Sequence, residues 1–163
     1  MDKTDRKILQ VLQADARASL QDISQAVGLS STPCWGRVKK MEEAGVIEGY
    51  TIRLNAQAIG LGDTVMVQVT LDSHSDNTLE KFGETLASIP EVIEAYLVSG
   101  EYDYLLRVAV KDTKDYERLL RERLYKIKGV RHSKSSFVLR TLKRADLPLF
   151  VSCVAPQHLL LIQ

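Results

Sequence analysis

Apolar residues recur at helical spacing three times in the first third of the chain. The pattern predicts a helix over residues 5–12, a second over 20–27 that ends at Gly28, and a third that is capped by Thr32, has Pro33 at its first position and ends at Gly45. Residues 46–54 then alternate around Gly49 and predict a small two-stranded ribbon. We therefore expect a three-helix domain with a wing.

From about residue 64 the pattern changes to the alternation of apolar and polar positions that is typical of strands. The predicted order is strand 65–71, helix 79–89, strand 92–98, strand 104–110, helix 113–127 and strand 130–142. This βαββαβ order is that of the ferredoxin-like fold, with two helices on one face of a four-stranded sheet. The opposite face carries residues such as Met66 and Tyr96, so we expect a partner to cover it.

The chain thus divides into an α+β arrangement of two domains. We place the helix-turn-helix domain at 1–54, with its motif at about 20–39, a linker at 55–63, the ferredoxin-like domain at 64–143 and a tail at 144–163. The tail contains the apolar run Leu159–Ile162. For the segment from Phe150 to Gln163 an accessory strand, a disordered end and a read-through remnant are all open interpretations.

Composition narrows the function classes. The 163 residues carry 22 Lys and Arg against 21 Asp and Glu, so any affinity for nucleic acid must come from a local patch. The two cysteines, Cys34 and Cys153, lie far apart in sequence, which suits a reducing cytoplasm. No stretch resembles a signal peptide or approaches ~18 apolar residues, so we expect a cytoplasmic protein without a membrane partner.

The segment 20–39 has the form of a helix-turn-helix, whose second helix fits the major groove of DNA, about 12 Å wide. Val38 and Met41 point inward in this pattern, so Arg37 and Lys40 are expected to share the outer face. A solvated Lys-rich face on a small helical domain is the alternative, because residues 2–53 carry eight basic and seven acidic side chains. The predicted DNA-binding residues are Ser30, Ser31, Thr32, Pro33, Trp35, Arg37, Lys39 and Lys40.

Two blocks of sequence resemble the Lrp/AsnC family of leucine-responsive and asparagine-responsive regulators. The first block consists of five segments in the first half of the chain: Asp2–Leu9, Val27–Cys34, Arg37-Val38, Gly45–Ile47 and Gly49-Tyr50. The second block is Leu97–Leu106 in the second half. The resemblance covers about residues 1–149 and implies a winged helix-turn-helix followed by a ferredoxin-like regulation-of-amino-acid-metabolism (RAM) domain. The chain departs from the family at Trp35-Gly36, where an aliphatic and a charged residue are usual, and after Leu149.

The loop between the second and third predicted strands is the second candidate site. An amino acid needs a carboxylate or carbonyl for its ammonium and amides for its carboxylate, and a glycine turn beside Glu101 and Asp103 offers both. The alternative is that this loop is an ordinary turn between two strands, since such turns commonly contain glycine and aspartate. The resemblance implies effector binding here, completed by residues between His132 and Ser136 of a neighbouring subunit. The predicted effector residues are Ser99, Gly100, Glu101, Tyr102, Asp103, Tyr104, Ser135 and Ser136.

Enzymatic chemistry has little support in the sequence. His74, His132 and His158 show no metal-ligand spacing, and Cys34 lies on the inward face of its helix. There is no Gly-rich phosphate loop of either common form. We therefore predict neither an enzyme nor a cofactor or metal.

The resemblance implies a cytoplasmic, nucleoid-associated transcription regulator. Its assembly and DNA binding would respond to an amino acid, leucine or a similar one, and control genes of amino-acid metabolism. Homodimers that assemble into tetramers or octamers would bind imperfect palindromic operators on double-stranded DNA. The alternative is an amino-acid-binding regulatory module that does not bind DNA.

Overall fold

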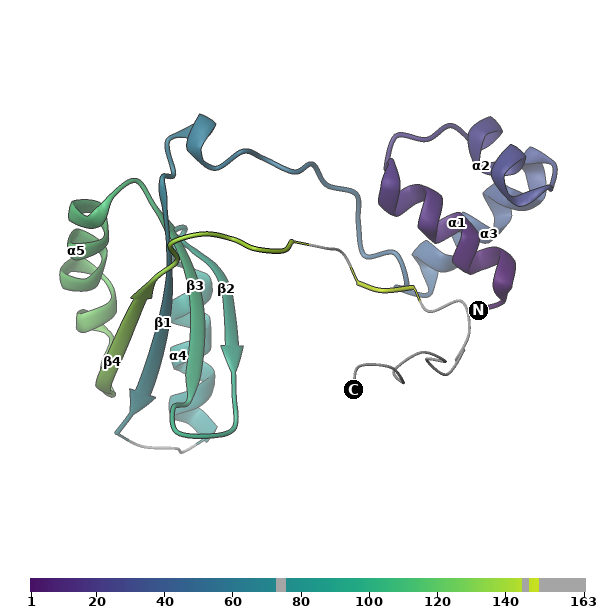
Figure 1. Cartoon of the computed structure of the whole chain (residues 1–163). Coiled ribbons are helices and arrows are strands. Elements are labelled where there is room, and N and C mark those ends of the chain that lie inside the picture. Colours follow the sequence, from purple (N-terminus) through teal and green to yellow (C-terminus); the bar gives the residue numbers. More distant parts are fainter. Residues whose placement is uncertain (73–75, 145–146, 150–163) are drawn as a thin grey trace, which may run out of the picture. The chain divides into compact units, whose positions relative to one another are not determined.

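The computed structural model describes residues 1–72, 76–144 and 147–149, and the chain forms two compact units (Figure 1). One unit contains Met1–Arg53 together with the described residues from Lys143 onward, and the other contains Leu54–Leu142. Each unit encloses its own cluster of buried apolar side chains. Each therefore has what an independent domain requires.

The first unit consists of three helices, α1 (Lys3–Ala14), α2 (Leu20–Val27) and α3 (Ser31–Glu43). α1 and α2 each begin with a capping box, in which the side chains of the cap residue and of the third helical residue bond each other's backbone amides. α2 ends at Gly28, whose φ of 72° suits glycine. The buried core consists of Ile8, Leu9, Ile23, Cys34 and Met41. The predicted helix-turn-helix is confirmed.

Two details of this unit differ from the sequence prediction. Ser30, not Thr32, is the cap of α3, so Pro33 occupies the third helical position; its missing amide costs nothing there because first-turn amides have no partner inside a helix. Residues 46–55 contain no strand in this described part of the chain, so the predicted ribbon is wrong. Two short strands alone bury too little apolar surface to be stable. Instead, Tyr50 donates its hydroxyl hydrogen to the Glu42 carboxylate (2.8 Å).

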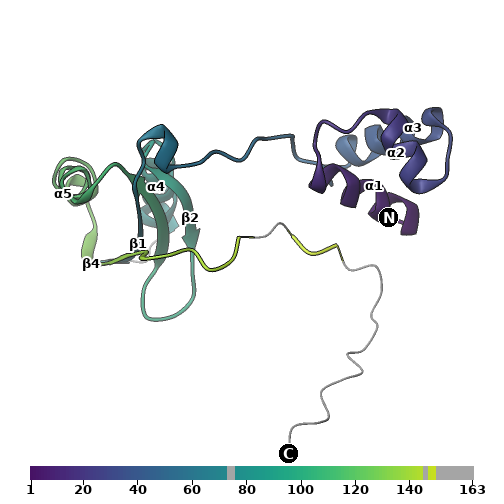
Figure 2. The same ribbon diagram turned by 45° about the horizontal axis from the view of Figure 1, so that its top comes forward.

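The second unit has the predicted ferredoxin-like topology. Its elements are η1 (Gln57–Ile59), β1 (Asp63–Leu71), α4 (Asp76–Ala87), β2 (Val92–Leu97), β3 (Tyr104–Val110), α5 (Thr113–Glu122), η2 (Leu124–Lys126) and β4 (Val130–Phe137). The strands are antiparallel in the order β2-β3-β1-β4. Alternate residues of β1 pack with Phe82 of α4 and Leu119 of α5, so both helices cover one face of the sheet (Figure 2).

Two elements of this unit are shorter than the pattern predicted. The helix expected to reach residue 127 ends at Glu122, because the backbone of Arg123 leaves the helical region before η2. The strand expected to reach residue 142 ends at Phe137, which lies opposite Val65 near the start of β1. The amide of Val138 still donates to the Thr64 carbonyl (2.9 Å), but β1 provides no further partners.

The described residues near the C-terminus lie on the helical unit. Leu149 packs against its apolar core, and the Gln13 side-chain amide donates a hydrogen bond to the Leu147 carbonyl (3.1 Å). Residues 147–149 therefore contribute to the packing of the first unit. The segment 150–163, for which three interpretations were open, lies outside the described residues.

Candidate functional site

The N-terminal end of α3 presents a surface of small polar side chains. Ser30, Ser31, Thr32 and Pro33 are all exposed. In contrast to the caps of α1 and α2, the Ser30 side chain makes no capping hydrogen bond within the described residues. The amides of Ser31 and Thr32 belong to the first turn, which has no partner inside the helix. This helix end can therefore donate hydrogen bonds to an anion.

One turn further along, α3 exposes an aromatic ring next to a cation. Trp35 is 53% exposed, and the Lys39 Nζ lies 5.2 Å from its ring centroid. The same Nζ lies 3.7 Å from a carboxylate oxygen of Glu43, an exposed pair that holds the ammonium only weakly. Gly36 follows Trp35, and a Cβ placed on it would meet nothing within 4 Å. This part of the helix surface is therefore open.

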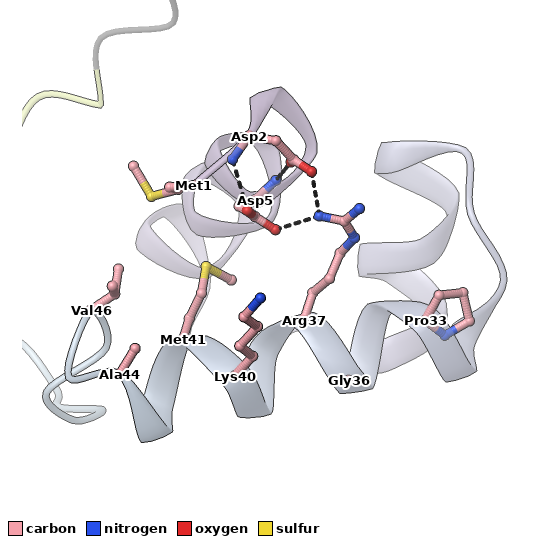
Figure 3. A pocket seen from close by; sticks show the side chains of 10 residues that line it. All are labelled: Met1, Asp2, Asp5, Pro33, Gly36, Arg37, Lys40, Met41, Ala44 and Val46. Atoms are coloured by element: carbon pink, nitrogen blue, oxygen red, sulfur yellow. Dashed lines mark hydrogen bonds and ion pairs between the residues drawn. The ribbon is translucent and has the colours of Figure 1, made fainter.

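Arg37 is turned toward α1, whereas Lys40 is exposed. The Arg37 Nη1 lies 2.6 Å from a carboxylate oxygen of Asp2 and 2.6 Å from one of Asp5 (Figure 3). The backbone amide of Asp5, followed by the Arg37 guanidinium, lowers the pKa of Asp2 below its ordinary value. The two carboxylates in turn raise the pKa of Arg37. Its side chain is 35% exposed, and its predicted contact with DNA stays a prediction.

The two aspartates were not predicted from the sequence as partners of α3. Acids three residues apart at a helix start indicate a capping box, and this signal was present at Asp2 and Asp5. Nothing in the spacing along α3 pointed to a partner 32 and 35 residues away. These side chains line a pocket of about 590 Å³ between α1 and α3, together with Met1, Pro33, Gly36, Lys40, Met41, Ala44 and Val46.

The loop between β2 and β3 is fastened to β1 through Asp103. The Asp103 amide donates to the Val69 carbonyl (2.9 Å), and the Asp103 Oδ2 accepts from the Leu71 amide (2.7 Å). The Asp103 carbonyl also accepts from the Val98 amide (2.9 Å), which closes the loop. The carboxylate predicted to bind an effector therefore also determines the shape of the loop.

The outer part of this loop is open to solvent. Ser99, Gly100 and Glu101 are exposed, and Tyr102 is half-buried. Gly100 has a φ of 141°, which residues with a side chain rarely adopt. Tyr104 differs from its neighbours: it is buried, with its ring 4.8 Å from that of Phe82 and its hydroxyl donating to the Leu79 carbonyl (2.8 Å). Burial raises the pKa of this hydroxyl.

The two serines predicted on the last strand lie on opposite faces of the sheet. The Ser135 hydroxyl is hydrogen-bonded to the Tyr116 hydroxyl of α5, on the helix-covered face. Ser136 is paired with Met66 and so lies on the open face. Ser136 sits three residues along β1 from Val69, a distance on the order of 10 Å within one chain. One chain by itself does not bring it to the loop.

The sheet face opposite the helices mixes apolar and charged side chains. Arg107 donates from Nε to the Glu94 carboxylate (2.8 Å) and pairs with it a second time through Nη2. The register places Met66, Gln68, Glu94, Tyr96, Leu105, Arg107, Lys134 and Ser136 on this face. Tyr96 is 50% exposed. A partner that covers this face would bury apolar side chains around a paired charge.

Neither a metal site nor a membrane-spanning helix occurs in the described part of the chain. Within 1–72, 76–144 and 147–149, no three His, Cys, Asp or Glu side chains come together in a way that could hold a metal ion. In the same ranges, every helix is too short or too polar to cross a membrane.

Family models match both units. Residues 1–48 match a winged helix-turn-helix DNA-binding model, and residues 64–148 match the Lrp/AsnC ligand-binding domain. The chain belongs to the Lrp/AsnC family. It is therefore a DNA-binding transcriptional regulator with a ligand-binding domain, as its named relatives are transcriptional regulators.

Individual Lrp/AsnC relatives match over nearly the whole chain. The leucine-responsive regulatory protein of Escherichia coli K12 is 38% identical over 146 residues, 90% of this chain and 89% of the relative. The transcriptional activator DecR of the same strain is 38% identical over 143 residues, 88% of this chain and 94% of its own.

Solved structures of Lrp/AsnC proteins agree with the fold. An AsnC family regulator from Agrobacterium tumefaciens has a TM-score of 0.87 and 41% identity, with 91% of this chain and 97% of that chain covered. A Neisseria meningitidis regulator in complex with L-Met has a TM-score of 0.87 and 34% identity, covering 92% and 97%.

Proposed function

We propose that α3 enters the major groove of operator DNA through its N-terminal end, and that the Gly100 loop takes part in binding an amino acid. The uncapped start of α3 is the main observation that supports the proposed DNA contact. The other two helices of this unit satisfy their own first amides with capping boxes, whereas α3 leaves its amides beside exposed hydroxyls. A DNA phosphate would supply the acceptor that the chain itself does not.

The proposed contact surface continues along the exposed side of α3. Lys39 and Lys40 carry the positive charge, and the Trp35 ring offers an apolar face suited to a thymine methyl group. The proposed contact residues are Ser30, Ser31, Thr32, Pro33, Trp35, Lys39 and Lys40. Because Trp35-Gly36 departs from the usual family residues, the operator sequence would differ from those of relatives at the base pairs facing it.

The proposed effector is an amino acid with an apolar side chain, leucine or a similar one. The complex of the Neisseria relative with L-Met supports this chemistry. Within the loop, Glu101 is an exposed carboxylate for the ammonium, while Ser99 and Gly100 offer amides and a hydroxyl for the ligand carboxylate. Ser136 of a second subunit would approach this loop only in an assembly.

The proposed assembly begins with a homodimer formed through the open sheet face. Met66, Leu105 and Tyr96 provide apolar surface there, around the Arg107–Glu94 pair. Dimers would place two α3 helices about 34 Å apart, which is one turn of DNA, so operators would be imperfect palindromes. Association of dimers into tetramers or octamers would let a ligand held between them shift the population that binds DNA. Such a regulator would act in the cytoplasm, on the nucleoid, at genes of amino-acid metabolism.

Selection of duplexes from a random library by the full chain tests this function. We expect enrichment of imperfect palindromes and binding that weakens steeply with salt. A thermal-shift screen of the twenty amino acids, with assembly size followed in parallel, identifies the effector; saturation at about 100 times Kd stabilises the fold by roughly 2.7 kcal/mol. A chain that binds an amino acid but enriches no duplex would instead be a regulatory module that does not bind DNA.

A further inference from the structure

Arg37 joins the recognition helix to the first turn of α1 through a closed set of hydrogen bonds. The Asp2 Oδ1 accepts from the Asp5 amide and the Asp5 Oδ2 accepts from the Asp2 amide, both at 2.8 Å. The remaining oxygen of each carboxylate accepts from the Arg37 Nη1, both at 2.6 Å (Figure 3). Each carboxylate therefore uses one oxygen to cap α1 and the other to hold α3.

The place of Arg37 along α3 agrees with a role at this junction. It lies three residues after Cys34 and four before Met41, both of which are buried in the core between the helices. Residues three and four apart lie on the same side of a helix. Arg37 is therefore at the edge of the packed face, whereas Lys39 and Lys40 are exposed.

The charge of the cluster argues against a phosphate contact. Asp2, Asp5 and Arg37 carry two negative charges and one positive charge, so the group of three has a net charge of −1. A phosphate brought to this guanidinium would meet two carboxylates at hydrogen-bond distance. The attraction that supplies most of the affinity for DNA is therefore offset at this guanidinium.

We propose that Arg37 is a positioning residue: its bridge to Asp2 and Asp5 fixes the orientation of α3 on α1, and it promotes DNA binding without touching DNA. The proposal rests on the DNA-binding function proposed above. It replaces the direct contact that the sequence predicted for Arg37, and it assigns to Asp2 and Asp5 a part in DNA recognition. Both contacts come from the single nitrogen Nη1, which carries two hydrogens and can therefore bond one carboxylate with each.

The test compares four variants of the full chain on one duplex selected by the wild type. Arg37→Ala breaks the bridge from α3, and Asp2→Asn with Asp5→Asn breaks it from α1 while keeping side-chain shape. Lys40→Ala is the comparison for the phosphate contact proposed at Lys40, and Arg37→Lys retains the charge and a nitrogen that can donate to both carboxylates. Affinity is measured across salt concentrations, and circular dichroism checks that each variant is helical.

Both ways of breaking the bridge are expected to weaken binding by about tenfold, a typical effect of losing a charge-assisted contact. The dependence of log affinity on log salt should keep its slope, whereas Lys40→Ala should lower the slope by about 0.9. A fifth variant, which combines Arg37→Ala with Asp2→Asn and Asp5→Asn, should show little further loss, because all three changes remove the same bridge. Arg37→Lys should recover part of the affinity.

Two results would overturn the proposal. If Arg37→Ala lowers the salt slope as Lys40→Ala does, Arg37 contacts phosphate. If the variant with both Asp2→Asn and Asp5→Asn binds more tightly than wild type, the carboxylates hold Arg37 away from DNA. Should Arg37→Ala lose its helical signal, Asp5→Asn alone tests the same two expectations. A wild-type chain that selects no duplex defeats the DNA-binding function itself, which distinguishes that failure from a failure of the bridge.

Discussion

At the scale of single residues, two glycines of the helical unit are predicted to respond in opposite ways to alanine. Gly36 lies inside α3 and has open space where a Cβ would be, so Gly36→Ala should stabilise the fold by about 0.5–1 kcal/mol. Gly28 ends α2 with a φ of 72°, so Gly28→Ala should destabilise it. Urea unfolding of the full chain measures both. An unchanged stability of the Gly36→Ala chain would contradict the expected gain from replacing a glycine inside a helix.

Asp103 provides a second prediction at this scale. Its carboxylate accepts the Leu71 amide, so Asp103→Ala should release the loop and weaken the response to amino acid by about ten- to hundredfold. Asp103→Asn keeps an acceptor for that amide and should retain more of the response. Calorimetric titration with leucine and with methionine compares the affinities of wild type, Asp103→Asn and Asp103→Ala, which are expected to decrease in that order.

The control for Asp103 is operator binding without ligand, which should change little because α3 belongs to the other unit. A loss of ligand-free binding would mean that Asp103 serves assembly. An unaltered response to ligand would remove the loop from the sensor.

Residue roles were predictable where periodicity decides them. The inward positions of Cys34 and Met41 follow from spacing along one helix and are confirmed by their burial. The partner of Arg37 was not predictable in this way, because a helical pattern gives the direction of a side chain but not which group from another helix meets it. Tyr104 shows the same limit: turn composition put it with the loop, and the packing of Phe82 makes it a core residue.

At the scale of elements, the start of α2 is predicted to depend on its capping box. The Ser19 hydroxyl and the Asp22 carboxylate bond each other, and each accepts the other residue's amide. Ser19→Ala should therefore destabilise the fold by about 1 kcal/mol. Thermal unfolding measures this loss. The control is Gln25→Ala, on the exposed side of the same helix, which should cost little.

The same box gives a pH dependence with a definite sign. The Ser19 hydroxyl, and then its amide, hold the pKa of Asp22 below its ordinary value of 3.8. Because the folded chain prefers the charged form, the contribution is present above pH 3.8 and is lost as the pH falls through the lower folded pKa. The stability difference between wild type and Asp22→Asn should therefore be present at neutral pH and shrink in acid. A difference that stays constant into strong acid would contradict this.

The open face of the sheet carries a prediction about assembly. Tyr96 lies on this face beside Leu105, so Tyr96→Glu should place a charge in the proposed dimer interface and shift the chain toward monomer. Tyr125→Glu is the matched control, because Tyr125 is 60% exposed and belongs to η2 rather than to a strand of the sheet. Sedimentation at micromolar concentrations compares the two. A Tyr96→Glu chain that remains as large as wild type would place the interface elsewhere.

Elements were predictable where the pattern is long and bounded. β1 follows from the alternation over residues 65–71, and the end of α2 follows from Gly28. The ribbon at 46–54 and the length of β4 were wrong because the existence of a strand depends on a neighbour to pair with, which alternation alone does not provide. β4 stops where β1 begins, a property of another segment of chain.

At the scale of the whole molecule, the order of the two domains follows from the sequence resemblance, and the family models confirm it. The effector site stays a prediction for a physical reason: one chain by itself does not bring Ser136 to the Gly100 loop, so the two would meet only if a second chain contributed one of them. The net charge of +1 likewise does not predict affinity for DNA, because that affinity depends on how a few lysines of α3 are placed.

The return of the C-terminal segment makes the helical domain discontinuous in sequence. Its core is completed by Leu149, far beyond the ferredoxin-like domain that is inserted between. A fragment that ends at Arg53 would lack this part, and should unfold at a lower temperature than the same domain in the full chain. Thermal unfolding of this fragment and of the full chain, followed by circular dichroism, would measure the difference.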